Sequence, residues 1–239
     1  MDREEAWLRE FAEKNSLDVE PLLKKLKEGV PLAYLIGTQP FHEIELKVDE
    51  RVLVPRPETE ELVERLLSVL PKKGEGLDLG CGSGAIALAL SKALPEWRFT
   101  ATDVSNEALS LAGENAALLG LSPRVDFQLG SWWDAVPDGA IFDLIVTNPP
   151  YVGTGEEIDL GASFEPRLAL FAGPDGLDAY RKILPNVKAH LKPGALFAGE
   201  CGPFHGKALL ELAKASGLSD ASILRDRAGR ERFIFARKD

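Results

Sequence analysis

From residue 76 onward, short apolar stretches alternate with helical patterns, and this rhythm restricts the fold more than any other feature of the sequence. Strands are expected at residues 76–79, 97–101, 124–129, 142–147 and 195–199, and helices at residues 85–94, 107–119, 178–191 and 206–215. Such alternation predicts a mainly parallel sheet with helices on both faces. Two last strands, at 222–224 and 232–236, have no helix between them, so one of them is expected to run antiparallel. The sequence therefore predicts an α/β fold with seven strands.

The first seventy residues lack this rhythm. Residues 4–14 have helical spacing, and Asp18 is placed to cap a second helix that Gly29 ends. Residues 41–54 read as an extended, hairpin-like linker, and a further helical run follows Thr59. At the other end of the chain, Lys192-Pro193-Gly194 is expected to close the helix at 178–191. We expect three parts: a small helical module at residues 1–40, a hairpin linker with a connecting helix at 41–70, and the sheet domain at 71–239.

Composition narrows the class of protein. With 239 residues and 45% hydrophobic residues, the chain has enough apolar material for one substantial core. A formal net charge of -10 argues against a protein whose main task is to grip duplex DNA. Cys81 and Cys201 are far apart and lack metal-ligand spacing, so we expect two reduced thiols and no metal site. Without an apolar signal core or a long apolar stretch, a soluble cytoplasmic protein is expected.

A glycine-rich loop lies between the first strand of the sheet and the helix that follows it. Its residues are Gly80, Cys81, Gly82, Ser83 and Gly84. Glycines allow a tight turn and a close approach of backbone to ligand, and the helix N-terminus offers free N–H groups. Asp103 ends the second strand about 20 residues later, where an acid can accept the hydroxyl protons of a ribose. Together these features predict an adenosine-type cofactor at the carboxyl edge of the sheet, although glycines can also serve a turn alone.

The spacing of the glycines distinguishes between cofactors. In the dinucleotide fingerprint the third glycine comes about three residues after the second, whereas here one residue separates Gly82 from Gly84. A serine-hydrolase elbow is excluded because glycine occupies the nucleophile position. With Asp78 ahead of the loop, the pattern fits S-adenosylmethionine better.

Asn148-Pro149-Pro150-Tyr151 follows the fourth strand directly and so lies at the same edge as the glycine loop. The prolines fix the chain and remove N–H donors, which leaves the Asn148 side-chain carbonyl and backbone carbonyls as acceptors. Two acceptors can hold both hydrogens of a planar NH2 group, whose nitrogen then faces the methyl donor. Tyr151 is expected to pack its ring against the target and face the sulfonium cation. The alternative for this motif is a rigid turn.

These motifs resemble those of the release factor glutamine methyltransferases (the PrmC/HemK family). The resemblance covers nearly the whole chain. It is carried by Tyr34-Leu35-Ile36-Gly37, Val54-Pro55-Arg56-Pro57-Glu58-Thr59-Glu60, residues 78–85, Asn148 to Tyr151, Phe164-Glu165-Pro166, and Ala228-Gly229-Arg230-Glu231-Arg232. It implies a Rossmann-like, mostly parallel methyltransferase sheet, and S-adenosyl-L-methionine as cofactor with S-adenosyl-L-homocysteine as product. The implied substrate is the glutamine of the Gly-Gly-Gln motif of class I release factors, with no stable nucleic acid and no membrane partner.

The resemblance also implies roles for individual residues. Residues 80–84, Asp103 and the aromatic residue after the third strand contact the cofactor, with Trp132 the best match for that aromatic residue and Trp133 its neighbour. Asn148, Pro149, Pro150 and Tyr151 hold the glutamine amide, and Asn148 also lies against the cofactor. The chain departs from the family in two ways: Ser131 stands where an acid is common, and the N-terminal helical module, which would recognise the substrate, is short.

Two other functions stay open at this point. A DNA or RNA amino-methyltransferase of the adenine N6 type shares Asn-Pro-Pro-Tyr, and an adaptor could bind the cofactor without transferring the methyl group. Four charged residues also have two readings each. Glu165 and Arg167 either order a loop over the site or form a surface ion pair, and Arg56 and Glu58 either pin the linker or touch the substrate. The histidines share no motif; they are His42, His190 and His205.

Overall fold

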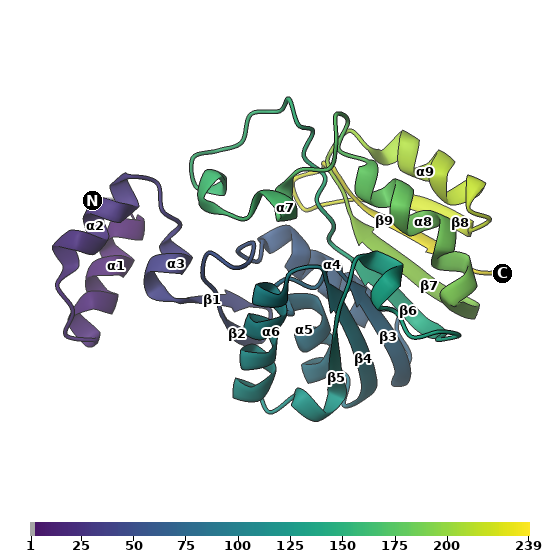
Figure 1. Ribbon diagram of the computed structural model, residues 1–239, viewed down its shortest axis with the longest axis horizontal. Coiled ribbons are helices and arrows are strands. Elements are labelled where there is room, and N and C mark those ends of the chain that lie inside the picture. The colour runs from purple at the N-terminus through teal and green to yellow at the C-terminus, as the bar shows by residue number, and fades with distance from the viewer. Residues whose placement is uncertain (1–2) are drawn as a thin grey trace.

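A seven-stranded sheet forms the centre of the computed structural model, which describes residues 3–239 (Figure 1). Its spatial order is β5-β4-β3-β6-β7-β9-β8. The strands are β3 (Lys73–Leu79), β4 (Glu96–Asp103), β5 (Val125–Leu129), β6 (Phe142–Thr147), β7 (Leu191–Glu200), β8 (Ser219–Arg225) and β9 (Glu231–Arg237). All neighbours from β5 to β7 pair in parallel, whereas β9 is antiparallel to both β7 and β8. The predicted α/β fold is confirmed, and the antiparallel strand is the last one in the chain.

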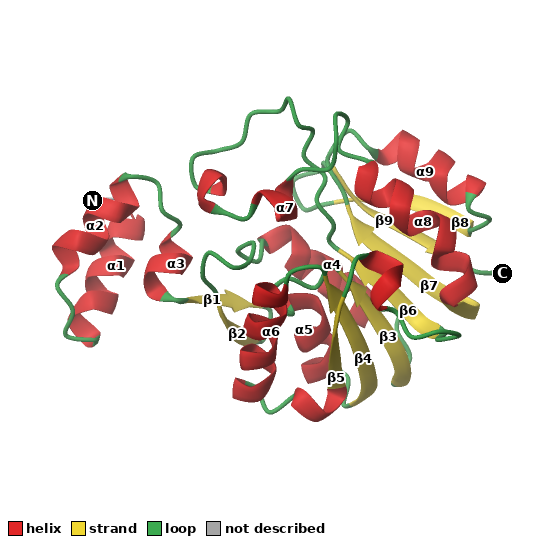
Figure 2. Ribbon diagram, viewed as in Figure 1, coloured by secondary structure: helices red, strands yellow, loops and turns green. Residues whose placement is uncertain are grey.

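Helices cover both faces of the sheet (Figure 2). They are α4 (Pro57–Leu67), α5 (Ala85–Ala93), α6 (Asn106–Leu118), α8 (Asp178–His190) and α9 (Gly206–Ala215). Apolar residues of α4 and α5 form one buried cluster with the sheet, and those of α8 and α9 form a second. Trp97 and Phe99 stack within the first cluster at 5.7 Å between ring centroids. Their partners on β3 are Gly74 and Gly76, where a Cβ would lie 2.7 and 2.3 Å from the rings, so glycine makes room for the aromatic pair.

The N-terminal helices lie at one end of the molecule and the C-terminus at the other (Figure 1). The elements of this end are α1 (Arg3–Lys14), α2 (Val19–Lys27), α3 (Leu32–Ile36), β1 (Thr38–Phe41) and β2 (Ile44–Lys47). Asp18 caps α2 as expected, by accepting a hydrogen bond from the Glu20 N–H at 3.1 Å. The sequence did not indicate α3, and the β1–β2 hairpin begins at Thr38, three residues ahead of the expected linker.

The segment after the hairpin, residues 48–56, is called the linker below, and it is attached at both of its sides. The Tyr34 hydroxyl of α3 donates to the Val52 carbonyl oxygen. On the other side, Asn115 of α6 accepts from the Lys47 N–H at 2.7 Å and donates to the Ser83 carbonyl oxygen at 3.0 Å. A buried asparagine therefore ties the last residue of β2, directly before the linker, to the glycine loop.

Two further boundaries differ from the prediction. Lys192-Pro193-Gly194 does not close α8 as a turn, because β7 already begins at Leu191. The Gly194 N–H donates to the Lys238 carbonyl oxygen at 2.7 Å, so pairing with the C-terminus keeps this proline-containing stretch in the sheet. Helix α4 begins at Pro57, two residues ahead of Thr59, since proline suits the first helical turn. Within residues 3–239, no helix combines the length and apolar character that crossing a bilayer requires.

Candidate functional site

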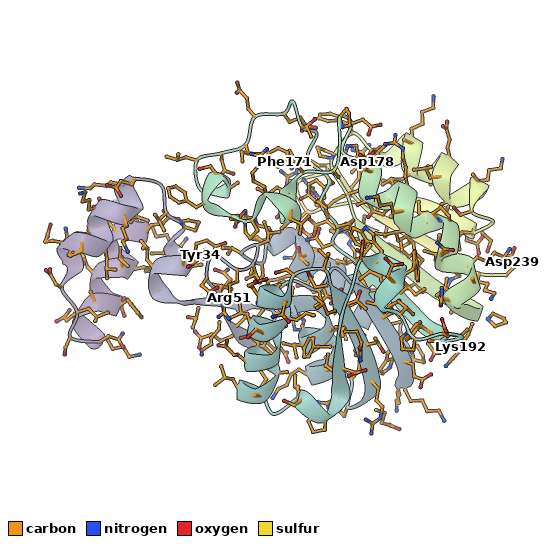
Figure 3. All side chains as sticks on the ribbon, in the orientation of Figure 1. Tyr34, Arg51, Phe171, Asp178, Lys192 and Asp239 are labelled. Atoms are coloured by element: carbon orange, nitrogen blue, oxygen red, sulfur yellow. The ribbon has the colours of Figure 1, made fainter. Side chains whose placement is uncertain are left out.

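A cavity of about 420 Å³ opens at the carboxyl edge of β3, β4 and β6. Residues from the glycine loop, the ends of β4, β5 and β6, the linker and helix α7 (Arg167–Leu170) line it. Three of the lining residues are labelled in Figure 3: Arg51 of the linker, Phe171 after α7, and Asp178 at the start of α8. The edge predicted for the cofactor and the reacting group therefore holds one continuous space.

The glycine loop curls over the edge of the sheet with Gly80, Gly82 and Gly84 at φ +74°, +54° and +80°. Residues other than glycine rarely adopt this left-handed backbone conformation. The N–H groups of Gly80 and Cys81 both donate to the Thr102 carbonyl oxygen, at 2.8 and 2.9 Å. A Cβ placed on Gly82 would meet no protein atom within 4 Å, so this backbone faces open space.

Asp103 holds the loop from the neighbouring strand. Its Oδ2 accepts from the Gly82 N–H and its Oδ1 from the Ser105 N–H, both at 2.9 Å. Burial raises the pKa of Asp103, and the backbone N–H donors act in the opposite direction. Each carboxylate oxygen has a second lone pair. The expected acid therefore lies beside the loop, lines the cavity and retains acceptor capacity for a ligand.

Asp78 lies just before the loop and bonds to the helix that follows the loop. It is fully buried, and its Oδ2 accepts from the Ala87 N–H in the first turn of α5 at 3.1 Å. Among the described residues its Oδ1 has no hydrogen-bond partner. Burial raises the pKa of Asp78 to about 7, and the nearby charge of Asp103 adds to this effect.

The two tryptophans after β5 have different surroundings. Trp132 lines the cavity next to Gly80, and its backbone has a φ of +49°, which is uncommon for a bulky residue. Trp133 lies outside the cavity lining: its Nε1 donates to the Ile183 carbonyl oxygen at 3.0 Å, and its ring stacks on His190 at 4.8 Å. Of the two predicted cofactor contacts, Trp132 is therefore the one placed to touch a ligand.

The Asn-Pro-Pro-Tyr motif contributes only part of its length to the cavity wall. Asn148 and Pro150 line the cavity, whereas Pro149 is buried and Tyr151 lies outside the lining. The Tyr151 hydroxyl donates to Oε1 of Glu200 at 3.1 Å, and burial raises the pKa of this hydroxyl above its usual value. Tyr151 therefore does not present its ring to the cavity in the way that the sequence suggested.

The loop between β6 and α8, residues 152–171, is called the flap (Figure 2). Its Glu165 is buried, accepts from the Val54 N–H at 3.1 Å and pairs with Arg56 of the linker. Burial raises the pKa of Glu165, while Arg56 lowers it. Arg167 stacks over the Phe171 ring at 4.4 Å and is not part of this pair. Glu165 thus joins the flap to the linker, and its pairing with Arg56 is no surface ion pair because the carboxylate is buried.

Two polar residues behind Asn148 were not predicted as part of the site. Thr59 donates to Oε2 of Glu200 at 2.7 Å and accepts from Nδ2 of Asn148 at 3.0 Å. Glu200 ends β7 at the same carboxyl edge as Asp103 and Asn148, and this strand-end position is the signal in the sequence that points to it. Among residues 3–239, no group of three or more histidines, cysteines or acids is arranged to hold a metal ion.

Glu58 was predicted either to pin the linker or to touch the substrate. Its carboxylate pairs with the Arg230 guanidinium at 2.8 Å, and Glu58 lies outside the cavity lining. The structure therefore favours a structural use of this acid, although the pairing is with the turn between β8 and β9 rather than with the linker.

Comparison with known proteins adds independent information. The family model "Methyltransferase small domain" matches residues 59–164. The release factor glutamine methyltransferase of Moorella thermoacetica is 46% identical over 213 residues, which cover 87% of this chain and 75% of the relative. That of Caulobacter vibrioides is 38% identical, covering 97% of this chain and 81% of the relative.

Solved structures show the same fold at lower identity. A methyltransferase from Pyrococcus furiosus superposes with a TM-score of 0.59 at 22% identity, covering 81% of this chain and 89% of that one. A 16S rRNA methyltransferase of T. thermophilus in complex with AdoMet and guanosine gives 0.60 at 20% identity, covering 84% of this chain and 50% of that one. At this identity the likeness establishes the fold alone.

Proposed function

Because this chain belongs to the family of release factor glutamine methyltransferases, we propose that it methylates the glutamine of the Gly-Gly-Gln motif in class I release factors. The methyl group of S-adenosyl-L-methionine goes to the side-chain amide nitrogen, and S-adenosyl-L-homocysteine is released. The observation that carries the proposal is the identity of 46% to a named relative over 87% of the chain. The cavity supports it, because the glycine loop and Asn148 share one space.

The residues around the cavity fit the cofactor. The backbone at Gly82 faces open space, which suits the methionine part, and Asp103 retains lone pairs for the two ribose hydroxyls. Trp132 offers an aromatic face for the adenine ring. Ser131 leaves no acid at that position, and the lining acids that remain are Asp103 and Asp178. When bound, the cofactor supplies an electrophilic methyl group on a sulfonium centre.

Asn148 and the prolines hold the acceptor amide. The Asn148 Nδ2 is engaged by Thr59, so its Oδ1 is the atom free to accept a hydrogen from the glutamine NH2 group. Pro149 and Pro150 have no N–H and leave backbone carbonyls as further acceptors. In this proposal Pro149 and Tyr151 support the motif from behind, since neither lines the cavity.

Placement supplies most of the rate enhancement in this scheme. An amide nitrogen is a weak nucleophile because its lone pair is delocalised. Hydrogen bonds from its two protons favour charge on nitrogen, and neutral hydrogen bonds contribute about 0.5–1.5 kcal/mol each. Alignment of the reacting atoms contributes up to about 7–11 kcal/mol. The methyl group would leave the sulfonium sulfur for the amide nitrogen, and this nitrogen would then release one of its protons to water, so no general base is required beside Asn148.

Mass spectrometry of a purified class I release factor tests the proposal. The factor is incubated with the enzyme and S-adenosyl-L-methionine, then digested, and the Gly-Gly-Gln peptide is fragmented. We expect one added methyl group on the glutamine side chain, and none with Asn148→Ala. An unmodified peptide, together with transfer of labelled methyl to DNA or RNA, would instead support the amino-methyltransferase alternative. Cofactor binding without transfer to either substrate would support the adaptor.

A further inference from the structure

A chain of hydrogen bonds runs behind Asn148 and away from the cavity. Nδ2 of Asn148 donates to the Thr59 hydroxyl at 3.0 Å, and this hydroxyl donates to Oε2 of Glu200 at 2.7 Å. On its other side, Oε1 of Glu200 accepts from the Tyr151 hydroxyl at 3.1 Å. The Tyr151 hydroxyl also accepts from Arg232 at 3.4 Å. Both O–H donors therefore converge on one carboxylate.

The direction of this chain follows from the hydrogen inventory. An ionised carboxylate can only accept hydrogen bonds, so the Thr59 hydroxyl must donate its single hydrogen to Glu200. The Thr59 oxygen then has only lone pairs left for Asn148, and the group of Asn148 that faces it must be the NH2. The carbonyl oxygen of Asn148 is consequently turned toward the cavity. The charge state of Glu200 thus determines which end of the Asn148 amide a substrate meets.

We propose that Glu200 and Thr59 are positioning residues that hold the Asn148 side chain with its carbonyl oxygen toward the acceptor amide. The inference rests on the proposed function and adds to it what fixes the orientation of the Asn148 amide in the cavity. Glu200 is 1% exposed and lies outside the cavity lining, so it acts on the site only through its hydrogen-bond partners. Thr59 borders the cavity but is 3% exposed, and its hydroxyl is already engaged by Glu200 and Asn148.

Stability alone does not account for this arrangement. A buried carboxylate loses its hydration, and a well-packed apolar side chain of similar size often gives equal or greater stability. What an apolar replacement cannot supply is a fixed hydrogen-bond direction. If the Asn148 amide were turned over, the substrate's NH2 group would meet another NH2 group and leave its own hydrogen unpaired.

Glu200→Gln is the informative substitution because glutamine has a donor and an acceptor. Arg232 donates to Tyr151, so Tyr151 places its own hydrogen on the side-chain carbonyl of the introduced glutamine, and the new NH2 group faces Thr59. Thr59 then donates to Asn148, and the Asn148 amide turns over. We expect kcat to fall about 10- to 100-fold, with the KM for the release factor within about twofold of wild type.

Thr59→Val and the double variant separate positioning from packing. Valine has no hydroxyl to donate to or accept from Asn148, so the Asn148 amide occupies both orientations. We therefore expect kcat to fall only about two- to fivefold. The double variant Glu200→Gln/Thr59→Val should therefore recover kcat to nearly that of Thr59→Val. Thr59→Ser keeps the hydroxyl, so its kcat should exceed that of Thr59→Val. Tyr180→Phe is the matched control, because it removes a buried hydroxyl bonded to the Glu200 backbone carbonyl. Losses that simply multiply in the double variant would overturn the proposal.

An NMR measurement tests the same point without a release factor. In the wild type one hydrogen of the Asn148 NH2 group is bonded to the Thr59 hydroxyl, so this hydrogen should exchange slowly with solvent. In Glu200→Gln the same NH2 group faces the cavity and should exchange faster, with the resonance assigned by its loss in Asn148→Ala. An unchanged hydrogen-exchange rate would refute this hydrogen-bond chain from Glu200 through Thr59 to Asn148 (the relay), whatever the substrate proves to be. Failure of wild-type methylation would refute the proposed function alone.

The pH dependence of kcat provides a second readout. Burial raises the pKa of Glu200, against the effects of Thr59, Arg232 and Tyr151. The titratable groups that face it are Glu58 of α4, Tyr151 after β6, Tyr180 of α8, Cys201 after β7 and Arg232 of β9. As pH falls through this raised pKa, the carboxyl gains a proton, donates to Thr59 and turns Asn148. We expect an acidic limb in the wild-type kcat profile and its absence in Glu200→Gln; identical profiles would contradict the relay.

Discussion

Asp103→Asn tests how the glycine loop is held and how the ribose is bound. Both carboxylate oxygens of Asp103 accept a backbone N–H at 2.9 Å, from Gly82 and Ser105. Asparagine has one acceptor oxygen, so one of these N–H groups must face its NH2 group. An unpaired, partly buried donor costs about 1–2 kcal/mol. For a chain of this length that corresponds to a decrease in Tm of about 2–8 °C.

The same substitution weakens the proposed ribose contact. Hydrogen bonds to a charged group contribute about 1.5–3 kcal/mol, so loss of one raises the Kd for S-adenosyl-L-homocysteine about 10- to 150-fold. Calorimetric titration measures the Kd, and a thermal scan measures the Tm. Asp126→Asn is the matched control, because Asp126 lies exposed on the adjacent strand and its carboxylate accepts from the Gln128 side chain. An unchanged Kd and Tm in Asp103→Asn would refute this account of the loop.

Two further predictions concern the cavity wall and the contact between the flap and the linker. Trp132→Ala should raise the Kd for S-adenosyl-L-homocysteine at least about fivefold, because the Trp132 ring lines the cavity. Trp133 lies outside the lining, so Trp133→Ala should lower the Tm and leave that Kd within about twofold. Equal effects of the two substitutions on the Kd would contradict the assignment. Glu165→Ala leaves the Val54 N–H unpaired and Arg56 without its carboxylate, so urea denaturation should show a free energy of unfolding lower by about 1–3 kcal/mol. No decrease would mean that the flap and the linker are held in another way.

The sheet was predictable because its strands and helices have strong local patterns, whereas the pairing of its last strands was not. The sequence indicated one antiparallel strand among the final two but could not say which, since β9 inserts between β7 and β8 through long-range contacts. The five-residue helix α3 is too short for a recognisable period. Pro193 and Gly194 suggested a turn that closes the helix, and pairing with the C-terminal residues overrides that local preference.

The site was predictable where function coincides with a strand end. Asp103 and Asn148 lie at the ends of strands, and the structure places both at the cavity. The sequence made Trp132 the better match and Trp133 its neighbour, but the backbone turn that decides which ring faces the cavity has no local pattern. Glu200 was missed because an acid after an apolar strand looks like an ordinary surface residue until its burial is known.

A structure of the protein with S-adenosyl-L-homocysteine and a peptide containing Gly-Gly-Gln tests the central claim most directly. The quantity to measure is the distance from the glutamine amide nitrogen to each terminal atom of the Asn148 side chain. We predict a hydrogen bond of about 2.7–3.2 Å to Oδ1, with Nδ2 still bonded to Thr59. A glutamine nitrogen that lies against another group, or an Asn148 whose Nδ2 has turned into the cavity, would contradict the account.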